Sequence, residues 1–347
     1  MSNLLNLRIA AFGESRSGKT VLLSTFYGRM RSASFIKSRG YSLVANSRAQ
    51  GNRLLELYHQ LESKKFPPAS LEHTLYAFSL MVNRLNQVAL NIEWDDYPGE
   101  WWTTDAVDAE YDHERETLPW NLLHSDAALF IVDGERYKEG GHHYLLKLFG
   151  KFREEFERQR IKMELEEDAP APGVMPWPKT WIIALSKCDI FPQTYTAEKF
   201  YKDIVSHQDI IEEIDLMKEK LSFQDANSTF GERFLLLSAV SVQEGVPVVS
   251  TGKGLDLIPA LLFKASLEDL KNKYRQNAKR QPPNVTKWIE SNLPLFGRFL
   301  GVNRFNESIR QQAEADKQSA DVLSEGINLI SIPLAGQEGE TLYYESI

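Results

Sequence analysis

Residues 13–20 read Gly-Glu-Ser-Arg-Ser-Gly-Lys-Thr (GESRSGKT). It fits the pattern G-x-x-x-x-G-K-[ST] in full, and it lies between the apolar run Asn6–Phe12 and the helical pattern Lys19–Arg31. In a strand–turn–helix unit of this kind, backbone N–H groups and the helix N-terminus together hold a phosphate group. The sequence therefore predicts a phosphate-binding loop at 13–20, called the phosphate loop below; the alternative is a flexible glycine turn.

Each part of the phosphate loop has an expected role. Lys19 would bridge the β- and γ-phosphates of a nucleotide, and the Thr20 hydroxyl would ligate Mg²⁺. Arg16 is either an exposed loop side chain or a charge supplied in cis to the reaction, as an arginine finger is. Lys19 and Arg16 are therefore candidate catalytic residues. The predicted nucleotide-binding residues of the loop are Gly13, Glu14, Ser15, Arg16, Ser17, Gly18, Lys19 and Thr20.

Outward from the loop, short apolar runs alternate with helical patterns. Three compact runs are typical of strands buried on both faces: Ala127–Asp133, Thr180–Leu185 and Arg233–Ala239. Helical patterns lie at Gln50–Lys64, Tyr144–Met163 and Ala197–Leu221. Thr74–Val82 and Gln87–Trp94 alternate in polarity across a polar turn, which predicts a hairpin. We expect an α/β fold, a P-loop NTPase whose doubly wound, mostly parallel sheet carries an antiparallel hairpin strand.

The alternation ends near Arg280, and this change sets the expected domain organisation. We predict a nucleotide-binding domain over residues 1–278, with helical insertions at about 31–70 and 140–179. A C-terminal extension would follow over 279–347, and its tail, 337–347, is expected to be flexible.

Composition excludes several other classes of protein. The chain has 347 residues with a net charge of −8, which argues against bulk nucleic-acid binding. Its single cysteine, Cys188, excludes a disulfide framework and predicts a cytoplasmic protein. No apolar run approaches the length of a membrane span.

The basic segment Lys271–Lys287 runs into an aromatic cluster. Residues 271–300 are therefore either a solvated helix end with a packed extension or a peripheral membrane or partner segment.

A second motif, Asp96-Tyr97-Pro98-Gly99, follows the strand predicted at Gln87–Trp94. An aspartate at this point can hold Mg²⁺ through water, and the N–H of Gly99 can meet a γ-phosphate and release it after hydrolysis. Asp95 is a competing carboxylate next to it. We favour Asp96 because only Asp96 has a glycine three positions later.

A third motif, Ser186-Lys187-Cys188-Asp189, follows the run Thr180–Leu185 and resembles the base-reading sequence [NT]-K-x-D. Asp189 would accept the two N–H groups on guanine N1 and N2, which adenine does not offer. Lys187 would lie along the base, and Ser186 stands where Asn or Thr is usual. Cys188 is expected near the base. The alternative is a solvated Lys/Asp turn.

A fourth, smaller element, Ser238-Ala239, follows the run that begins at Arg233. Its backbone is expected to meet guanine O6. In this order and strand context, the four elements resemble those of the Ras-like (TRAFAC-class) P-loop GTPases, over about residues 6–270. The strings GESRSGKT and DYPGEW are most similar to the YcjX-like branch and to GTPases of bacterial conflict systems.

The resemblance implies GTP and GDP as ligands, Mg²⁺ as the metal, and hydrolysis of GTP to GDP and phosphate by a molecular switch. It implies a switch hydroxyl that caps the metal, for which Ser70 and Thr74 are the candidates, with Ser70 favoured. Glu100 occupies the position of the water-orienting glutamine, so it is the third candidate catalytic residue. Because a carboxylate there repels the γ-phosphate, we expect slow hydrolysis that a protein partner stimulates. Trp101-Trp102 is either core packing or a partner surface.

Two other functions remain open from the sequence. One is a nucleotide-sensing interaction module with little hydrolysis, which Glu100 motivates. The other is a P-loop ATPase in which Ser186–Asp189 is coincidental. Besides guanine nucleotide, the expected partners are a protein effector or activator and, on nucleotide binding, a second copy of the chain.

Overall fold

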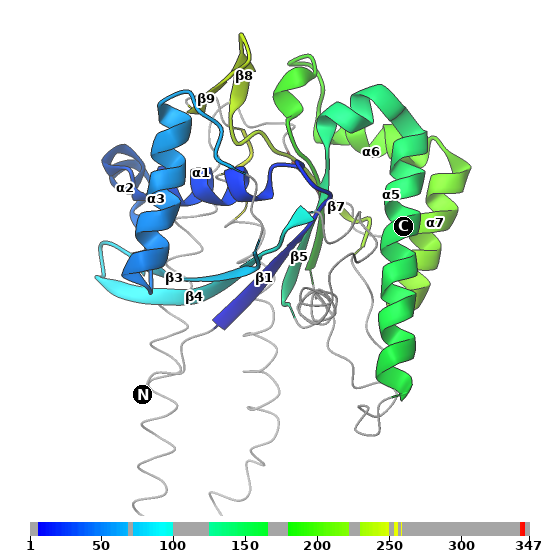
Figure 1. Ribbon diagram of the computed structural model, residues 1–347, viewed down its shortest axis with the longest axis horizontal. Helices are drawn as coiled ribbons and strands as arrows, with labels where there is room; N and C mark the ends of the chain where they lie inside the picture. Colours follow the sequence, from blue (N-terminus) through cyan, green and yellow to red (C-terminus); the bar gives the residue numbers. More distant parts are fainter. Residues whose placement is uncertain are drawn as a thin grey trace, which may run out of the picture.

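The structure, a computed structural model of the chain, describes residues 6–68, 72–99, 125–165, 180–221, 230–249, 253–255, 258 and 341–343. Within these residues, a sheet of eight strands forms the centre of the fold (Figure 1). In spatial order its strands are β10 (Thr341–Tyr343), β7 (Arg233–Leu236), β6 (Thr180–Leu185), β5 (Ala127–Val132), β1 (Asn6–Phe12), β4 (Gln87–Asp96), β3 (Thr74–Val82) and β2 (Tyr41–Ala45).

The strand directions confirm the predicted doubly wound α/β fold. β7, β6, β5, β1 and β4 run parallel to one another. β3 is antiparallel to both β4 and β2, so the predicted hairpin is present, and its second strand continues to Asp96. This is the sheet of a P-loop NTPase.

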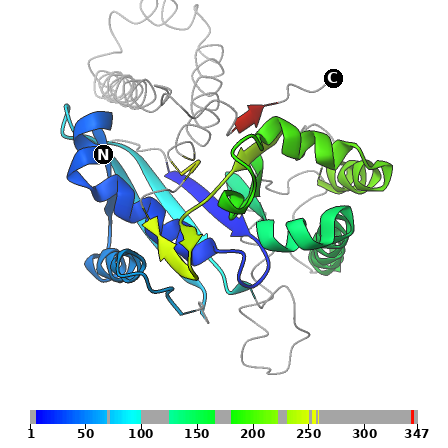
Figure 2. The same cartoon turned by 90° about the horizontal axis from the view of Figure 1, so that it is seen from above.

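The central strands are apolar because helices cover both faces of the sheet (Figure 2). Every residue of β5 and of β6 is buried. Along β1, Ile9 and Ala11 pack into one core, whereas Ala10 and Phe12 pack into the other. Side chains alternate in this way because successive residues of a strand point to opposite faces.

Two groups of helices supply these cores. One side carries α1 (Lys19–Arg31), α2 (Ala33–Arg39) and α3 (Arg48–Glu62); the other carries α5 (Gly134–Leu165), α6 (Ala197–Val205) and α7 (Gln208–Leu221). Among the described helices, none is long and apolar enough to cross a membrane.

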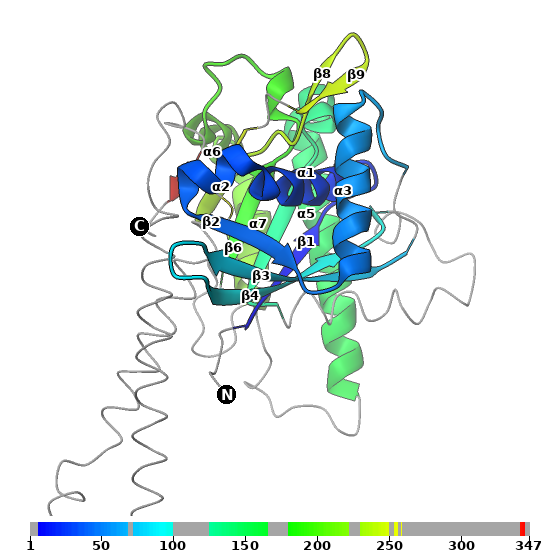
Figure 3. The ribbon, with the colours of Figure 1, turned by 90° about the vertical axis from the view of Figure 1, so that its left-hand side faces the viewer.

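Three elements differ from the sequence expectation. β2 lies inside the insertion expected at 31–70, where it completes the sheet beside β3. The helical pattern Ala197–Leu221 forms two helices, α6 and α7, which are separated at Ser206-His207. β8 (Ser241–Gln243) and β9 (Val246–Val248) form a separate two-stranded sheet that contacts α3 (Figure 3).

The insertion was expected to begin at residue 140, but this residue lies inside α5, which starts at Gly134. This helix is kinked at Gly141, whose φ of 54° and ψ of −137° are not helical. Three residues of the tail that we expected to be flexible, Thr341–Tyr343, form β10 antiparallel to β7. Their backbone covers an edge of β7 that would otherwise be unpaired.

Candidate nucleotide-binding site

A cavity of about 590 Å³ lies at the carboxyl ends of the parallel strands. Its walls come from the phosphate loop after β1, from Tyr97 and Gly99 after β4, and from the residues that follow β6 and β7. In open α/β sheets, ligands bind in the crevice outside the carboxyl ends of the strands. The fold therefore brings the four sequence motifs to a single hollow.

The phosphate loop turns sharply between β1 and α1. Gly18 caps α1 with φ of 91°, a left-handed conformation that glycine adopts without steric cost. The N–H of Ser17 donates to the carbonyl of Glu14 at 3.2 Å, which closes the turn. Arg16 also has a positive φ, of 66°, and its exposed side chain lies at the wall of the cavity.

The ammonium of Lys19 lies inside the phosphate loop. It donates to the carbonyls of Gly13 at 2.6 Å and Glu14 at 3.1 Å, and the residue is 6% exposed. Burial lowers the pKa of Lys19 to about 8, although the nearby carboxylates of Asp96 and Glu14 oppose that shift. A phosphate that accepts the loop N–H groups would lie beside this cation.

Thr20 and Asp96 meet next to Lys19. The Thr20 hydroxyl donates to Oδ2 of Asp96 at 3.0 Å, and Asp96 is 1% exposed. Burial raises the pKa of Asp96, and its Oδ1 has no hydrogen-bond partner among the described residues. A hydroxyl oxygen and an unsatisfied carboxylate oxygen at one point are the donor chemistry that Mg²⁺ takes together with water.

The competing carboxylate, Asp95, serves a different contact. Its Oδ2 accepts from Nε of Arg8 at 2.8 Å, and its Oδ1 lies 3.0 Å from Nε2 of His73. Burial alone would raise the pKa of Asp95, but the bonds from His73 and Arg8 outweigh burial and hold that pKa below its usual value. Asp95 is thus committed to partners within the chain, whereas Oδ1 of Asp96 has no partner among the described residues.

Residues 186–189, called the base loop below, are tied to β5 and to the residues after β7. Both the N–H and the hydroxyl of Ser186 donate to the carbonyl of Val132, at 2.9 and 3.1 Å. Oδ1 of Asp189 lies 2.8 Å from the hydroxyl of Ser238, which is also 2.8 Å from the carbonyl of Val240, so these two acceptors share one hydroxyl proton. The carboxylate of Asp189 is therefore oriented at the cavity wall by a second motif residue.

The backbone and the side chain of the Ser238-Ala239 element make different contacts. The N–H of Ser238 donates to the carbonyl of Lys253 at 3.1 Å, so this amide is already used. Ala239 lines the cavity, and its amide is the candidate donor to a base oxygen. The hydroxyl of Ser238 contacts Asp189. The backbone contact of this element with guanine O6 stays a prediction.

The sequence matches the family model described as Double-GTPase 2 over residues 7–207. The chain belongs to the Double-GTPase 2 family. The matched range contains the phosphate loop, Asp96–Gly99 and the base loop, and it ends before Ser238. The broader prediction of a P-loop GTPase is thereby confirmed.

Solved structures similar to this Double-GTPase 2 chain are distant in sequence. The S. cerevisiae Ski7 GTPase-like domain bound to GTP is 16% identical with a TM-score of 0.30, and the match covers 68% of this chain and 43% of that one. The same domain bound to GDP and inorganic phosphate gives 16% identity, a TM-score of 0.31 and the same coverages of 68% and 43%. The apo cytosolic domain of the T. maritima FeoB iron transporter is 12% identical with a TM-score of 0.34, over 93% of this chain and 98% of that one. This chain thus spans 43% of the Ski7 chain. A search of curated proteins found no match.

The structure does not place every predicted site residue of this Double-GTPase 2 chain in the cavity wall. Ser70, Glu100 and Trp101-Trp102 fall outside the described residues. Thr74, the other candidate switch hydroxyl, starts β3 in register with Asp96 but is not part of the cavity wall.

Cys188, which the sequence places near the base, does not line the cavity. It is 5% exposed and packs into the core beneath α5–α7, while Lys187 and Asp189 on either side line the cavity. The short 3-10 turn Cys188–Ile190 turns the cysteine inward. Chemical modification of the Cys188 thiol would therefore disturb the packing of this core directly, and it would affect nucleotide binding only through that disturbance.

Several residues of the cavity wall belong to none of the four sequence motifs. Phe66, which is 49% exposed, and Val242, which is 48% exposed, lie on its rim, and Glu135 contributes a carboxylate. The proline pair after Phe66 marked a fixed turn at this position, but no spacing rule linked Val242 or Glu135 to a ligand.

Proposed function

We propose that this Double-GTPase 2 chain is a molecular switch that binds GTP and GDP with Mg²⁺ and slowly hydrolyses GTP to GDP and phosphate. The observation that carries the proposal is one cavity lined by the phosphate loop and by Asp189, in which Thr20 is hydrogen-bonded to Asp96 behind the wall and Asp189 contacts Ser238. These three features address the phosphates, the metal and the guanine base, respectively.

The roles of the chain's residues follow from this geometry. Lys19 and the loop N–H groups would bind the β- and γ-phosphates, and Thr20 and Asp96 would hold Mg²⁺ and its waters. When bound, Mg²⁺ neutralises charge that develops on the transferred phosphoryl group. Asp189 would accept hydrogen bonds from N1 and N2 of guanine, and the Ala239 amide would donate a hydrogen bond to guanine O6.

The proposal is tested by the nucleotide preference of the purified protein. Calorimetry with GDP, GTP, ADP and ATP, with Mg²⁺ and again with EDTA, should show binding of guanine nucleotides only, strengthened for GTP by Mg²⁺. Equal affinity for GDP and ADP would instead favour the P-loop ATPase.

We also propose that hydrolysis is slow and stimulated by a protein partner or by dimerisation on GTP. Glu100 in place of glutamine motivates this proposal, and the exposed Arg16 at the cavity wall supplies a cation that a partner could press onto the nucleotide. Single-turnover hydrolysis by native protein, Glu100→Gln and Arg16→Ala measures both contributions. Tight GTP binding without any turnover would leave a nucleotide-sensing module.

The finer family placement and the cellular setting are further proposals. The strings GESRSGKT and DYPGEW support a relationship to the YcjX-like branch and to conflict-system GTPases. The single cysteine and the acidic net charge of −8 support a cytoplasmic location. Any membrane contact would be peripheral, through 271–300.

Replacing Asp96 by asparagine is expected to weaken Mg²⁺-dependent GTP binding by about 10- to 100-fold, the usual loss when a group that orients a metal is removed. Asp95→Asn is the matched control on the neighbouring residue. It should leave Mg²⁺ dependence intact and instead lower the free energy of unfolding by roughly 1–3 kcal/mol, because Arg8 and His73 lose a charged acceptor. Magnesium titration and urea unfolding of both variants separate the two roles. If Asp95→Asn weakened Mg²⁺-dependent binding and Asp96→Asn did not, Asp95 would be the metal-binding residue.

Gly99→Ala is expected to slow GTP hydrolysis by about 10²-fold, since a displacement of around an ångström at a reacting centre can cost this much. An added Cβ would lie 2.4 Å from Cα and 2.5 Å from N of Ser15, so the Gly99 backbone must move away from the phosphate loop. GDP affinity should change little. Gly150→Ala is the control, because its Cβ would meet only Oε1 of Glu213, at 3.8 Å. A hydrolysis rate in Gly99→Ala equal to that of the control would contradict the assigned contact.

A further inference from the structure

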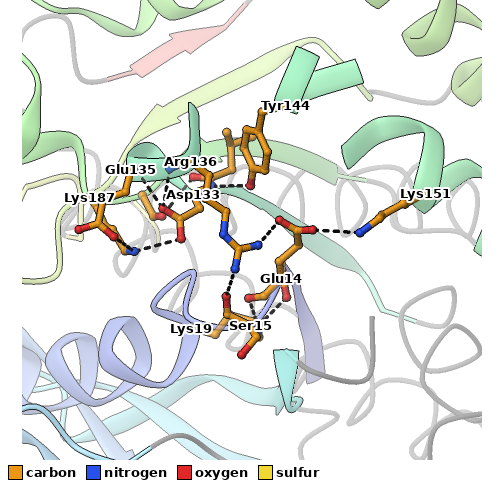
Figure 4. A network of polar contacts seen from close by, with 12 residues as sticks. Glu14, Ser15, Lys19, Asp133, Glu135, Arg136, Tyr144, Lys151 and Lys187 are labelled. Carbon is orange, nitrogen blue, oxygen red and sulfur yellow. Dashed lines mark hydrogen bonds and ion pairs between the residues drawn. The ribbon is translucent and has the colours of Figure 1, made fainter. Parts of the chain in front are cut away.

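A polar network joins the phosphate loop to the start of α5 and to the base loop (Figure 4). We propose that Arg136, which no sequence motif marks, is a positioning residue that neutralises Glu14 and thereby holds the phosphate loop in its nucleotide-binding shape. This inference rests on the proposed binding of guanine nucleotides.

Arg136 makes two contacts with the phosphate loop. Its Nη1 forms a short charge-assisted bond to Oε2 of Glu14, and its Nη2 donates to the backbone carbonyl of Ser15 at 3.1 Å. A second cation, Lys151, lies further along α5, and its Nζ is 3.4 Å from the other carboxylate oxygen of Glu14. Residues of α5 therefore bind both the Glu14 side chain and the backbone of the phosphate loop.

Glu14 needs this neutralisation because of where it lies. It is an acidic residue within a loop that would receive phosphates, and it is only 7% exposed. Its backbone carbonyl also accepts from Lys19 at 3.1 Å. A buried carboxylate without a partner is costly in itself, and here it would also repel the incoming phosphates.

The same turn of α5 reaches the base loop on its other side. Oδ1 of Asp133 accepts the N–H of Glu135 at 2.9 Å, and Oδ2 accepts from Nζ of Lys187 at 3.0 Å. An added Cβ on Gly134 would lie 2.3 Å from the carbonyl oxygen of Ser186, so the two segments are in backbone contact. Residues 133–136 thus form a spacer between the phosphate loop and the base loop.

Removing the guanidinium should act chiefly through the carboxylate that it leaves behind. Arg136→Met is expected to weaken GDP binding by about 10- to 100-fold, in the range found when one partner of a desolvated charge pair is truncated. In Glu14→Gln there is no charge left to neutralise, so adding Arg136→Met to it should cost no more than about threefold. A merely structural role for Arg136 predicts no rescue, because the double variant loses still more contacts.

The experiment measures GDP affinity by calorimetry with Mg²⁺ for the native chain, Arg136→Met, Glu14→Gln and the double variant. Thermal melting without nucleotide confirms that each variant folds. An unchanged affinity in Arg136→Met, or a double variant as weak as Arg136→Met, would overturn the proposal. Failure of the native chain to bind GDP would instead refute the proposed function, and the two failures are therefore distinct.

A milder variant covers the case in which Arg136→Met does not fold. Arg136→Lys keeps a cation beside Glu14 but makes one bond where the guanidinium makes two. A loss of about threefold is expected, again relieved by Glu14→Gln. If Arg136→Lys shows no loss, or a loss that Glu14→Gln does not relieve, Arg136 does not act through this carboxylate.

Discussion

Lys19→Ala is expected to lower the affinity for GTP and the rate of its hydrolysis by at least about 10²-fold each, the scale on which a positioned donor at a developing negative charge contributes. The ammonium lies within the phosphate loop, 2.6 Å from the carbonyl of Gly13, and the loop offers no second lysine. Alanine leaves the loop's N–H groups in place but removes the cation that faces the β- and γ-phosphates. Calorimetry with GTP and single-turnover hydrolysis measure the two losses.

The same variant should not unfold the protein. Because burial lowers the pKa of Lys19 to about 8, below its usual value, the charged ammonium is held at a cost to the folded chain. The nucleotide-free variant should therefore melt no lower than the native chain. Lys37→Ala, an exposed lysine on α2, is the matched control and should change neither binding nor hydrolysis. Undiminished GTP binding by Lys19→Ala would contradict the assigned site.

Asp189→Asn should reduce GDP affinity by about 10³-fold or more, since sites built around specific hydrogen bonds discriminate on this scale. A carboxylate accepts from both N1–H and the N2 amino group of guanine. The asparagine amide offers one acceptor and one donor group, so its NH₂ would face the N2 amino group without an acceptor. The Ser238 hydroxyl, which lies 2.8 Å from Oδ1 of Asp189, would hold the mismatched amide in place.

The chemistry of the amide predicts a gain as well as a loss. Xanthine has a carbonyl at C2 in place of the amino group, so an asparagine can pair with its N1–H and its C2 oxygen. Affinities for GDP, XDP and ADP, measured side by side, should show that Asp189→Asn prefers XDP. Asp215→Asn, on the exposed side of α7, is the control and should keep the native order. An unchanged preference for GDP over ADP in Asp189→Asn would remove Asp189 from base recognition.

The part of the fold that the sequence predicted is the part where local pattern and burial agree. β1 and β6 were predicted to the residue, because each is a short, mostly apolar run that two layers of helices cover, although β1 also contains Asn6 and Arg8. β2 and β10 were not, because each is a short strand that exists through pairing with an available neighbour, β3 or β7. Pairing between distant segments leaves no period in the sequence.

The candidate site divides in the same way. The sequence marked Lys19, Thr20 and Asp189, which line the cavity, because a phosphate or a base demands fixed residue types at fixed spacing. Arg136 was not found, because its contact joins residues separated by 122 positions and serves the loop rather than a ligand. The two adjacent aspartates show a third case: spacing favoured Asp96, and the structure adds the reason, since Arg8 and His73 already bind Asp95.

The two-sided burial of the central strands also affects how the molecule opens. Local unfolding begins where few apolar contacts must be broken, which here means the three-residue edge strand β10 and the opposite edge, β2. β5 and β6, with every residue buried, would open only when the whole domain unfolds. Because the phosphate loop and the base loop extend from β1 and β6 in the interior of the sheet, fraying at either margin leaves the nucleotide cavity assembled.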